Sequence, residues 1–210
     1  MSGCLWKWVY LGLCTNPLVM LSEEQIDFLS SKEFFQLKKE ADNKIGSMLY
    51  STQNYIQTLW NSRNRWHLPA EVSKIPGKIS KGNNYKGFPY QVFDYPSAFV
   101  EKGIFSFRIV VWYGNSFSVN LILTNAFLEF FHPQIQRLVG KNIQLMKEGN
   151  IWETDTSTSS LVPLETPYLA DINGYFEKNE SIRLIRQFDM NQINSLHRLT
   201  VECFNDWFTL

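Results

Sequence analysis

The sequence predicts an α+β fold in which a largely antiparallel sheet with a central hairpin packs against a long N-terminal helix and a C-terminal helix. Apolar and polar residues alternate along 104–113 and again along 116–124, which is typical of two half-buried strands. Apolar residues recur at steps of three and four along 34–59 and along 193–208, which is typical of amphipathic helices. The order of helices, then strands, then a helix indicates an α+β domain.

The composition indicates a folded protein without a dominant charge. Hydrophobic residues make up 44% of the 210 residues and aromatic residues 15%, which is too apolar for a disordered chain. The 20 basic and 20 acidic residues balance, so no global field draws the molecule toward nucleic acid or a membrane. No apolar run reaches the roughly 18 residues that span a bilayer. Nucleic acid is therefore not favoured as a partner, and no membrane association is expected.

The charges are unevenly distributed along the chain. Residues 61–87 carry six bases against the single acid Glu71, and residues 148–180 carry seven acids against the single base Lys178. Such blocks could meet within the fold, meet across a dimer, mark a binding face, or be two solvated loops. The last interpretation is favoured.

The first nineteen residues differ in composition from the rest of the chain, and three interpretations compete. An export or lipoprotein signal is disfavoured because Lys7 interrupts the apolar stretch and because Leu13 stands directly before Cys14, where a small residue is expected. The segment could be an element that packs on the core, or it could precede a true start at Met20, which is the favoured interpretation. We therefore expect a single α+β domain over 20–210 and treat 1–19 as a doubtful extension.

The cysteine pattern predicts a reducing, cytoplasmic environment. The three cysteines are Cys4, Cys14 and Cys203, with no CxxC spacing. An odd count without such spacing argues against a disulfide framework or a zinc site. Cys203 is expected to be a small buried residue on the last helix.

Two helices are predicted at the start of the domain. Ser22 and Gln25 have the spacing of a capping box, which predicts a short helix through Leu29. Ser31 is then the expected cap of a long helix that fades near Asn61.

The central strands have a register that the sequence decides. Residues 88–95 read as a strand closed by Pro96. A two-residue loop at Gly114-Asn115 would set the apolar faces of the next two strands on opposite sides of the sheet. A three-residue loop puts them on one side, with Gly114 or Asn115 at positive φ, and this loop is predicted.

The C-terminal half is predicted from weaker signals. A helix is expected from Pro133 to about Lys147, one or two strands within 151–164, and a strand over 181–189. A final helix then begins with a cap at Asp189 or Asn191.

No motif for a known chemistry is present. The chain lacks a Gly-rich phosphate loop, a dinucleotide fingerprint and a nucleophile elbow. Its histidines, His67, His132 and His197, are far apart and have no metal-ligand spacing. We therefore assign no catalytic residue, no metal ligand and no cofactor.

The segment 77–90 is a first candidate for ligand binding, because it combines three lysines, three glycines and two tyrosines. Glycines let backbone amides approach an anion, and lysines supply positive charge. The same residues also suit a plain edge hairpin, which is the favoured interpretation. The candidate ligand residues here are Lys78, Lys81, Tyr85, Lys86 and Tyr90.

Asp94, Arg108 and Trp112 form a second candidate group. Arg108 alternates onto the face opposite the apolar side chains of its strand, in line with Trp112. An arginine inside a strand must pair, stack on an aromatic ring or face water. A pair with Asp94 on the neighbouring strand could be a structural bridge or the floor of a pocket, and the bridge is favoured.

Three runs of sequence carry a resemblance. KISKGNNYKGFPYQVFDYP (78–96), IFSFRIVVWYGNSFSVNL (104–121) and SIRLIRQFDMNQINSLHRLTVECF (181–204) resemble a group of bacterial proteins of similar length with no assigned activity. The resemblance extends from about Ser22 to the C-terminus. It implies a cytoplasmic bacterial protein and transfers no catalytic residue.

Two functional hypotheses follow. The first is a non-enzymatic binding or interaction domain that forms a homodimer through its aromatic-rich sheet or its last helix. The second is a protein that binds a phosphate-bearing small molecule or nucleotide through 77–90, or an enzyme that acts on such a ligand.

Overall fold

The computed structural model describes residues 20–62, 71–72, 76–157 and 161–208, so the predictions for 1–19 and for His67 lie outside the described residues. The chain divides into two compact units, 1–42 and 43–210. Their boundary lies inside a helix, whereas the sequence placed a boundary at Met20.

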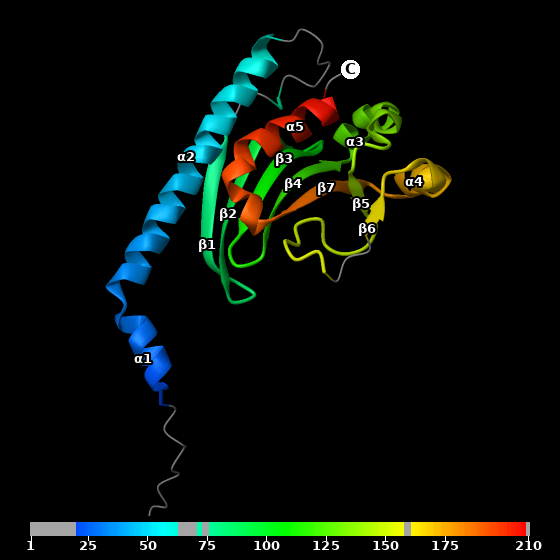
Figure 1. Cartoon of the computed structure of the whole chain (residues 1–210). Coiled ribbons are helices and arrows are strands. Elements are labelled where there is room, and N and C mark those ends of the chain that lie inside the picture. The colour runs from blue at the N-terminus through cyan, green and yellow to red at the C-terminus, as the bar shows by residue number, and fades with distance from the viewer. Residues whose placement is uncertain (1–19, 63–70, 73–75, 158–160, 209–210) are drawn as a thin grey trace, which may run out of the picture. The chain divides into compact units, whose positions relative to one another are not determined.

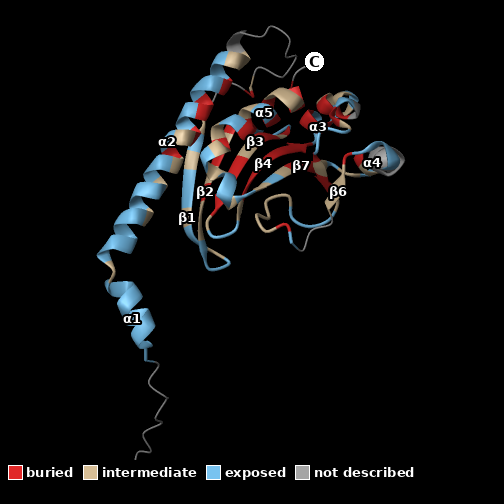
Figure 2. Ribbon diagram, viewed as in Figure 1, coloured by how far each residue is buried: buried red, intermediate tan, exposed pale blue. Residues whose placement is uncertain are grey.

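The first unit contains α1 (Glu23–Ser30) and the beginning of α2 (Lys32–Ser62). The capping box is confirmed, since Ser22 Oγ accepts from the amide of Gln25 at 3.2 Å and Gln25 Oε1 accepts from the amide of Ser22 at 2.9 Å. Ser31 Oγ accepts from the amide of Phe34 at 3.2 Å and caps α2 as predicted. No residue of α1 is buried (Figure 2).

The second unit is built on one antiparallel sheet, which confirms the predicted α+β class (Figure 1). Within the described residues the sheet has seven strands in the order β1-β2-β3-β4-β7-β5-β6. The strands are β1 (Lys78–Tyr85), β2 (Phe88–Val100), β3 (Gly103–Trp112), β4 (Ser116–Thr124), β5 (Gln144–Met146), β6 (Leu161–Pro163) and β7 (Ser181–Asp189).

The β3–β4 hairpin has the predicted three-residue loop. Trp112 pairs with Ser116 and Val111 with Phe117, which leaves three residues in the turn. Gly114 supplies the positive φ of 73°. The apolar side chains of both strands therefore share one face, and Phe107 and Leu121 lie opposite each other there with no exposed area.

Helix α5 (Leu196–Phe208) covers this apolar face (Figures 1 and 2). Phe204, Trp207 and Phe208 each bring a ring centroid within 5.8 Å of the ring of Phe107. The second half of α2 packs beside α5, where Thr52 Oγ1 lies 3.1 Å from Nδ1 of His197. The long N-terminal helix and the C-terminal helix thus both contribute to the core, as predicted.

Strand β2 is longer than predicted. The sequence closed it at Pro96, but pairing with β3 continues to Val100. The register shifts between Asp94 and Ser97, so Pro96 lies in a bulge, where its missing N–H does not interrupt the ladder.

The predicted helix from Pro133 to Lys147 is wrong in both bounds. Helix α3 (Ala126–Phe131) starts earlier and continues as a 3-10 helix over His132–Leu138. Gly140, with φ of 76°, lies just after this segment, and 144–146 forms β5 beside β7. Buried Ile143 and Leu145 flank the less buried Gln144, which is the alternation of a strand.

Among the remaining elements, β6 and β7 follow the prediction, whereas α4 (Leu169–Lys178) was not predicted and α5 begins later than the predicted cap at Asp189 or Asn191. Of 151–164, 161–163 forms β6, and α4 follows. β7 has the predicted bounds, and Asp189 precedes a 3-10 turn, Met190–Ser195, without a capping bond from its side chain. Among the described residues no helix is long and apolar enough to cross a membrane.

Candidate functional site

The segment 77–90 is an edge hairpin, and its lysines do not converge. Lys78 pairs with Asp94 and Lys81 with Gln91, so alternation places the two lysines on opposite faces of β1. Lys86 lies in the two-residue turn between β1 and β2, with φ of 50°. Its ammonium group lies 2.8 Å from Oδ2 of Asp155 and 3.9 Å from Oε1 of Glu153.

The glycines of this hairpin have structural reasons. A Cβ on Gly82 would lie 2.3 Å from the ring of Tyr90, and a Cβ on Gly77 would lie 2.6 Å from the ring of Phe93. Gly87 has φ of 86°, as the second residue of a tight hairpin turn requires. Close ring packing and turn geometry therefore account for the residues that had suggested an anion loop.

The aromatic candidates come together at one end of the polar face of the sheet, as we call the face opposite Phe107 and Leu121, to which Arg108 and Trp112 belong. The ring centroid of Tyr85 lies 6.1 Å from that of Tyr90 and 5.3 Å from that of Trp112. Tyr85 Oη accepts from the amide of Asp155 at 3.1 Å. This cluster therefore holds the segment 147–157, which runs across the polar face.

The predicted partnership of Arg108 and Asp94 is confirmed. Arg108 Nε and Nη2 donate to the two carboxylate oxygens of Asp94 at 2.7 and 3.0 Å, and Ser106 Oγ donates to Oδ1 at 2.5 Å. The guanidinium also lies 4.5 Å above the ring of Trp152, which stacks on Phe99. A paired and covered arginine supports the structural bridge.

Arg183 was not singled out by the sequence, yet it is the most buried charged group of the polar face, at 2% exposure. Its Nε donates to Asn120 Oδ1 at 2.9 Å, and its Nη1 donates to the carbonyls of Ile151 and Glu153. Burial, with a further contribution from the positive charge of Arg108, lowers the pKa of Arg183 to about 10. Its acceptors are mainly backbone carbonyls, so no side-chain pattern could reveal this site.

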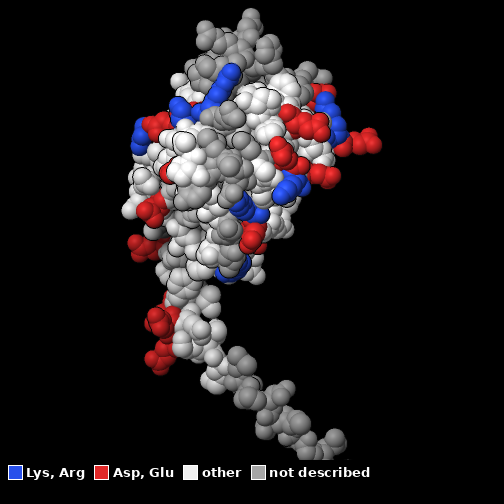
Figure 3. All heavy atoms as spheres, turned by 90° about the vertical axis from the view of Figure 1, so that its right-hand side faces the viewer, with Lys and Arg blue, Asp and Glu red and all other residues white. Residues whose placement is uncertain are grey.

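The charge blocks of the sequence meet at one point. Lys86 from the basic block binds Asp155 from the acidic block. Hydrogen bonds from Lys86 and Ser157 lower the pKa of Asp155 to about 2. Over the face that Figure 3 shows, basic and acidic side chains are interspersed without a continuous basic patch.

Cys203 and His197 have structural surroundings. Cys203 is fully buried and unpaired, and burial raises the pKa of its thiol to about 12, which argues against a nucleophile. His197 contacts Thr52 and stacks edge-on against Tyr55. Among the described residues, no three histidine, cysteine or acidic side chains are grouped to hold a metal ion.

The apolar face of the sheet and the apolar side of α5, which were expected to form a dimer, are packed against each other. Phe105, Phe107 and Leu121 of the sheet have no exposed area, and Phe204 and Trp207 of α5 are at most 2% exposed. These side chains are therefore not available to a second copy, whereas Phe88 and Phe99 of the sheet are 44% and 49% exposed, and the homodimer stays a prediction.

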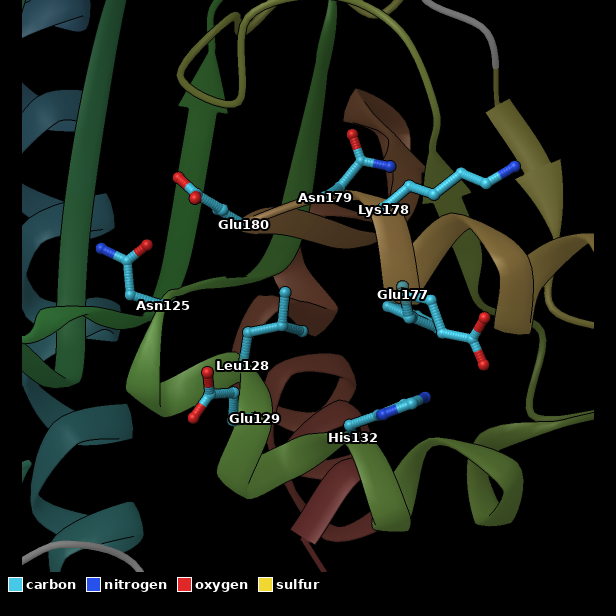
Figure 4. Close-up of a pocket in the computed structure, with 9 residues that line it drawn as sticks. Asn125, Leu128, Glu129, His132, Glu177, Lys178, Asn179 and Glu180 are labelled. Atoms are coloured by element: carbon cyan, nitrogen blue, oxygen red, sulfur yellow. The ribbon is translucent and has the colours of Figure 1, made fainter.

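A cleft of about 500 Å³ lies between α3 and the C-terminal end of α4 (Figure 4). The pairing of Thr124 with Ser181 brings the end of β4 beside the start of β7, so the helices attached there flank one hollow. The amide of Asn125 donates to the carbonyl of Glu180 at 2.8 Å and fixes this junction. The cleft is lined by Asn125, Leu128, Glu129, His132, Phe176, Glu177, Lys178, Asn179 and Glu180.

The cleft has an apolar floor and an acidic rim. Leu128 and Phe176 are at most 6% exposed, and the ring of His132 lies 5.5 Å from that of Phe176. Figure 4 shows Leu128 between two polar sides, one with Asn125 and Glu180 and the other with His132 and Glu177. Three glutamates against one lysine give the lining a net negative charge.

Comparison with protein-family models, with curated proteins and with solved structures found no match. The resemblance to a group of bacterial proteins therefore stays a prediction.

No pattern in the sequence directly indicates the cleft. His132 directly precedes the helix predicted from Pro133, and Glu177 and Glu180 belong to the acidic block 148–180, for which a solvated loop is the favoured interpretation. Their meeting depends on the pairing of β4 with β7, which joins residues more than 40 positions apart.

Proposed function

We propose that the protein is a non-enzymatic binding protein and that the cleft between α3 and α4 takes a small organic cation. The observation that supports this most is the combination of a buried apolar and aromatic floor with three glutamates at the rim. Binding sites for small molecules are concave, mostly apolar, and carry a few polar groups that orient the ligand.

The net negative charge of the cleft lining favours a cationic ligand. A carboxylate rim repels anions and favours an ammonium or guanidinium group, which can donate to Glu177 or Glu180. The rings of Phe176 and His132 favour an adjoining flat apolar part, since aromatic faces attract both rings and cations. An aromatic or branched amine combines both properties.

Calorimetric titration with three ligands that share a benzene ring and differ in charge tests this. Benzylamine carries a positive charge, benzyl alcohol is neutral and benzoate is negative. We expect benzylamine to bind about 10-fold more tightly than benzyl alcohol and benzoate to give no saturable heat.

Single substitutions test whether benzylamine binds in the cleft. Glu177→Gln should weaken benzylamine binding by about threefold to 10-fold, because it removes one charge from the rim and leaves the floor intact. Glu165→Gln, on an exposed acid outside the cleft, is the matched control and should bind as the wild type does. Equal affinity for benzylamine and benzyl alcohol, or no effect of Glu177→Gln, would contradict the proposal.

A phosphate-bearing ligand at 77–90 remains the second candidate, with less support. Lys78 and Lys81 point to opposite faces of β1, and Lys86 is paired with Asp155. A thermal-shift screen with nucleotides and phosphorylated metabolites tests it. A shift removed by Lys81→Ala and Lys86→Ala would favour this candidate over the cleft.

We also propose that the protein works in the cytoplasm of a bacterium. The support is the odd cysteine count, the buried and unpaired thiol of Cys203 and the resemblance described above. Nucleic acid is not proposed as a partner, and salt-independent flow through heparin is the expected behaviour.

A further inference from the structure

The arm, as we call residues 20–42, presents an apolar surface that the fold of the second unit does not need. Its eight large apolar side chains are between 38% and 81% exposed. They are Met20, Leu21, Ile26, Phe28, Leu29, Phe34, Phe35 and Leu37. So many large apolar side chains exposed on one short segment favour an interaction site.

The surface of the arm is uneven. Across Ser31, where α1 ends and α2 begins, the ring centroid of Phe28 lies 4.4 Å from that of Phe34, and Phe34 lies 5.3 Å from Phe35. These rings form a ridge. Beside it, α1 carries a hollow of about 430 Å³ lined by Leu21, Glu24, Gln25, Phe28 and Leu29. One surface therefore offers both a projection and a recess.

The charges of the arm are divided between its two halves. The first half, 20–31, carries three acids and no base, whereas all three lysines of the arm lie in 32–42 together with three acids. Two arms side by side in parallel would bring the acidic halves together. Two antiparallel arms would bring the acidic half of each against the half that holds lysines, which lowers the electrostatic energy.

We propose that two copies of the chain associate through antiparallel arms, with the two-fold axis near Ser31. Glu24 and Lys38 are equally far from Ser31 in sequence, as are Glu23 and Lys39, so each of these two acids of one copy faces a lysine of the other. Lys38, which pairs with Asp42 of its own helix at 3.0 Å, then lies between two carboxylates. Phe28 then faces Phe34, and Leu37 lies opposite the hollow around Gln25. This is an isologous contact, in which both copies use the same surface.

The available area suits a dimer. A fully exposed phenylalanine or leucine offers on the order of 200 Å², and the eight side chains are on average about half exposed, so the arm offers on the order of 800 Å² of apolar surface. One partner of a standard interface contributes about that area. The proposal is independent of the cleft, which lies in the second unit.

Sedimentation velocity of the full chain at micromolar concentrations tests the association. We expect a dimer for the wild type and a monomer for Phe28→Glu combined with Leu37→Glu. Tyr50→Glu, on an exposed ring of α2 outside the arm, is the matched control and should remain dimeric. Because Phe28 and Leu37 are 49% and 65% exposed, the arm variants should keep the thermal unfolding of the second unit unchanged.

A charge swap tests the orientation. Glu23→Lys with Glu24→Lys should weaken the dimer about fivefold or more, and Lys38→Glu with Lys39→Glu should do the same. All four substitutions in one chain should restore the dimer, because each glutamate–lysine pair between the antiparallel arms then becomes a lysine–glutamate pair.

Several results would overturn the proposal. They are a monomeric wild type, a dimer that survives Phe28→Glu with Leu37→Glu, or a four-substitution chain that stays monomeric. A monomer that floats with phosphatidylcholine–phosphatidylglycerol vesicles would assign the apolar surface to lipid and overturn it as well.

Discussion

The two faces of the central sheet are covered by different means. On one face, α5 brings Phe204 and Trp207 against Phe107, and the contact consists of rings. On the other face, the segment 147–157 is held by Arg183, Arg108 and Tyr85 through hydrogen bonds and ring contacts.

The difference shows where stability and adaptability lie. Apolar burial is non-directional, so the ring face tolerates small shifts but depends on volume. The polar face depends on direction, since each donor of Arg183 must reach a particular carbonyl. We therefore expect core variants to change global stability and polar-face variants to change the local order of 147–157.

The largest effect is expected from the ring face. Phe107→Ala removes a fully buried ring that contacts three aromatic residues of α5 and should lower the free energy of unfolding by about 3–5 kcal/mol. Urea unfolding measures it. Phe99→Ala, whose ring is 49% exposed, is the control and should cost much less. Similar losses for the two variants would break the comparison.

A smaller and more local effect is expected from Arg183→Ala. It leaves Asn120 and two carbonyls without their donor and should cost about 2–3 kcal/mol. Hydrogen exchange of 150–157 should accelerate more than that of β4.

Two further variants delimit the effect of Arg183. Arg183→Lys should not restore protection, because an ammonium group cannot span the same acceptors. Arg198→Ala, in an exposed pair with Glu202, should change stability by less than about 0.5 kcal/mol. An Arg183→Ala protein with native exchange in 150–157 would show that the segment is held by other contacts.

The smallest effect is expected at low pH, where Asp155 is protonated and its contribution to stability is lost. The pKa of Asp155 lies at about 2 when folded, below its ordinary value of 3.8, so its contribution is present above about pH 4 and is lost as pH falls through 2. The lysine partner is 45% exposed, so this contribution should be below about 1 kcal/mol. The stability difference between wild type and Asp155→Asn should shrink toward zero between pH 5 and pH 2. A stability difference that stays constant from pH 5 to pH 2 would contradict this prediction.

The features that the sequence could predict are those that depend on local patterns. The loop of three residues at Gly114 and the pairing of Asp94 with Arg108 follow from alternation, which is a local signal. The helix predicted from Pro133 to Lys147 includes the strand at 144–146, because three residues carry too little alternation to outweigh a proline and an apolar run.

The contacts of Arg183 and the cleft could not be predicted for another reason. The carbonyls of Ile151 and Glu153 have no side-chain signature, and His132 meets Glu177 only because β4 pairs with β7. The stripe predicted on the long helix was right in spacing, but Phe34 and Leu37 are exposed while Thr52 and Ile56 are buried. Periodicity shows which side of a helix is apolar and leaves open what covers it.

The most direct test of the proposed cleft is the methyl NMR signal of Leu128 during titration with benzylamine. Leu128 lies in the floor of the cleft, whereas Leu145 is buried in β5 outside its lining and serves as the internal reference. The account predicts a saturable shift of the Leu128 methyl signals, reduced by Glu177→Gln, with the Leu145 signals unchanged. Signals of Leu128 that stay fixed, or that move equally with benzoate, would contradict it.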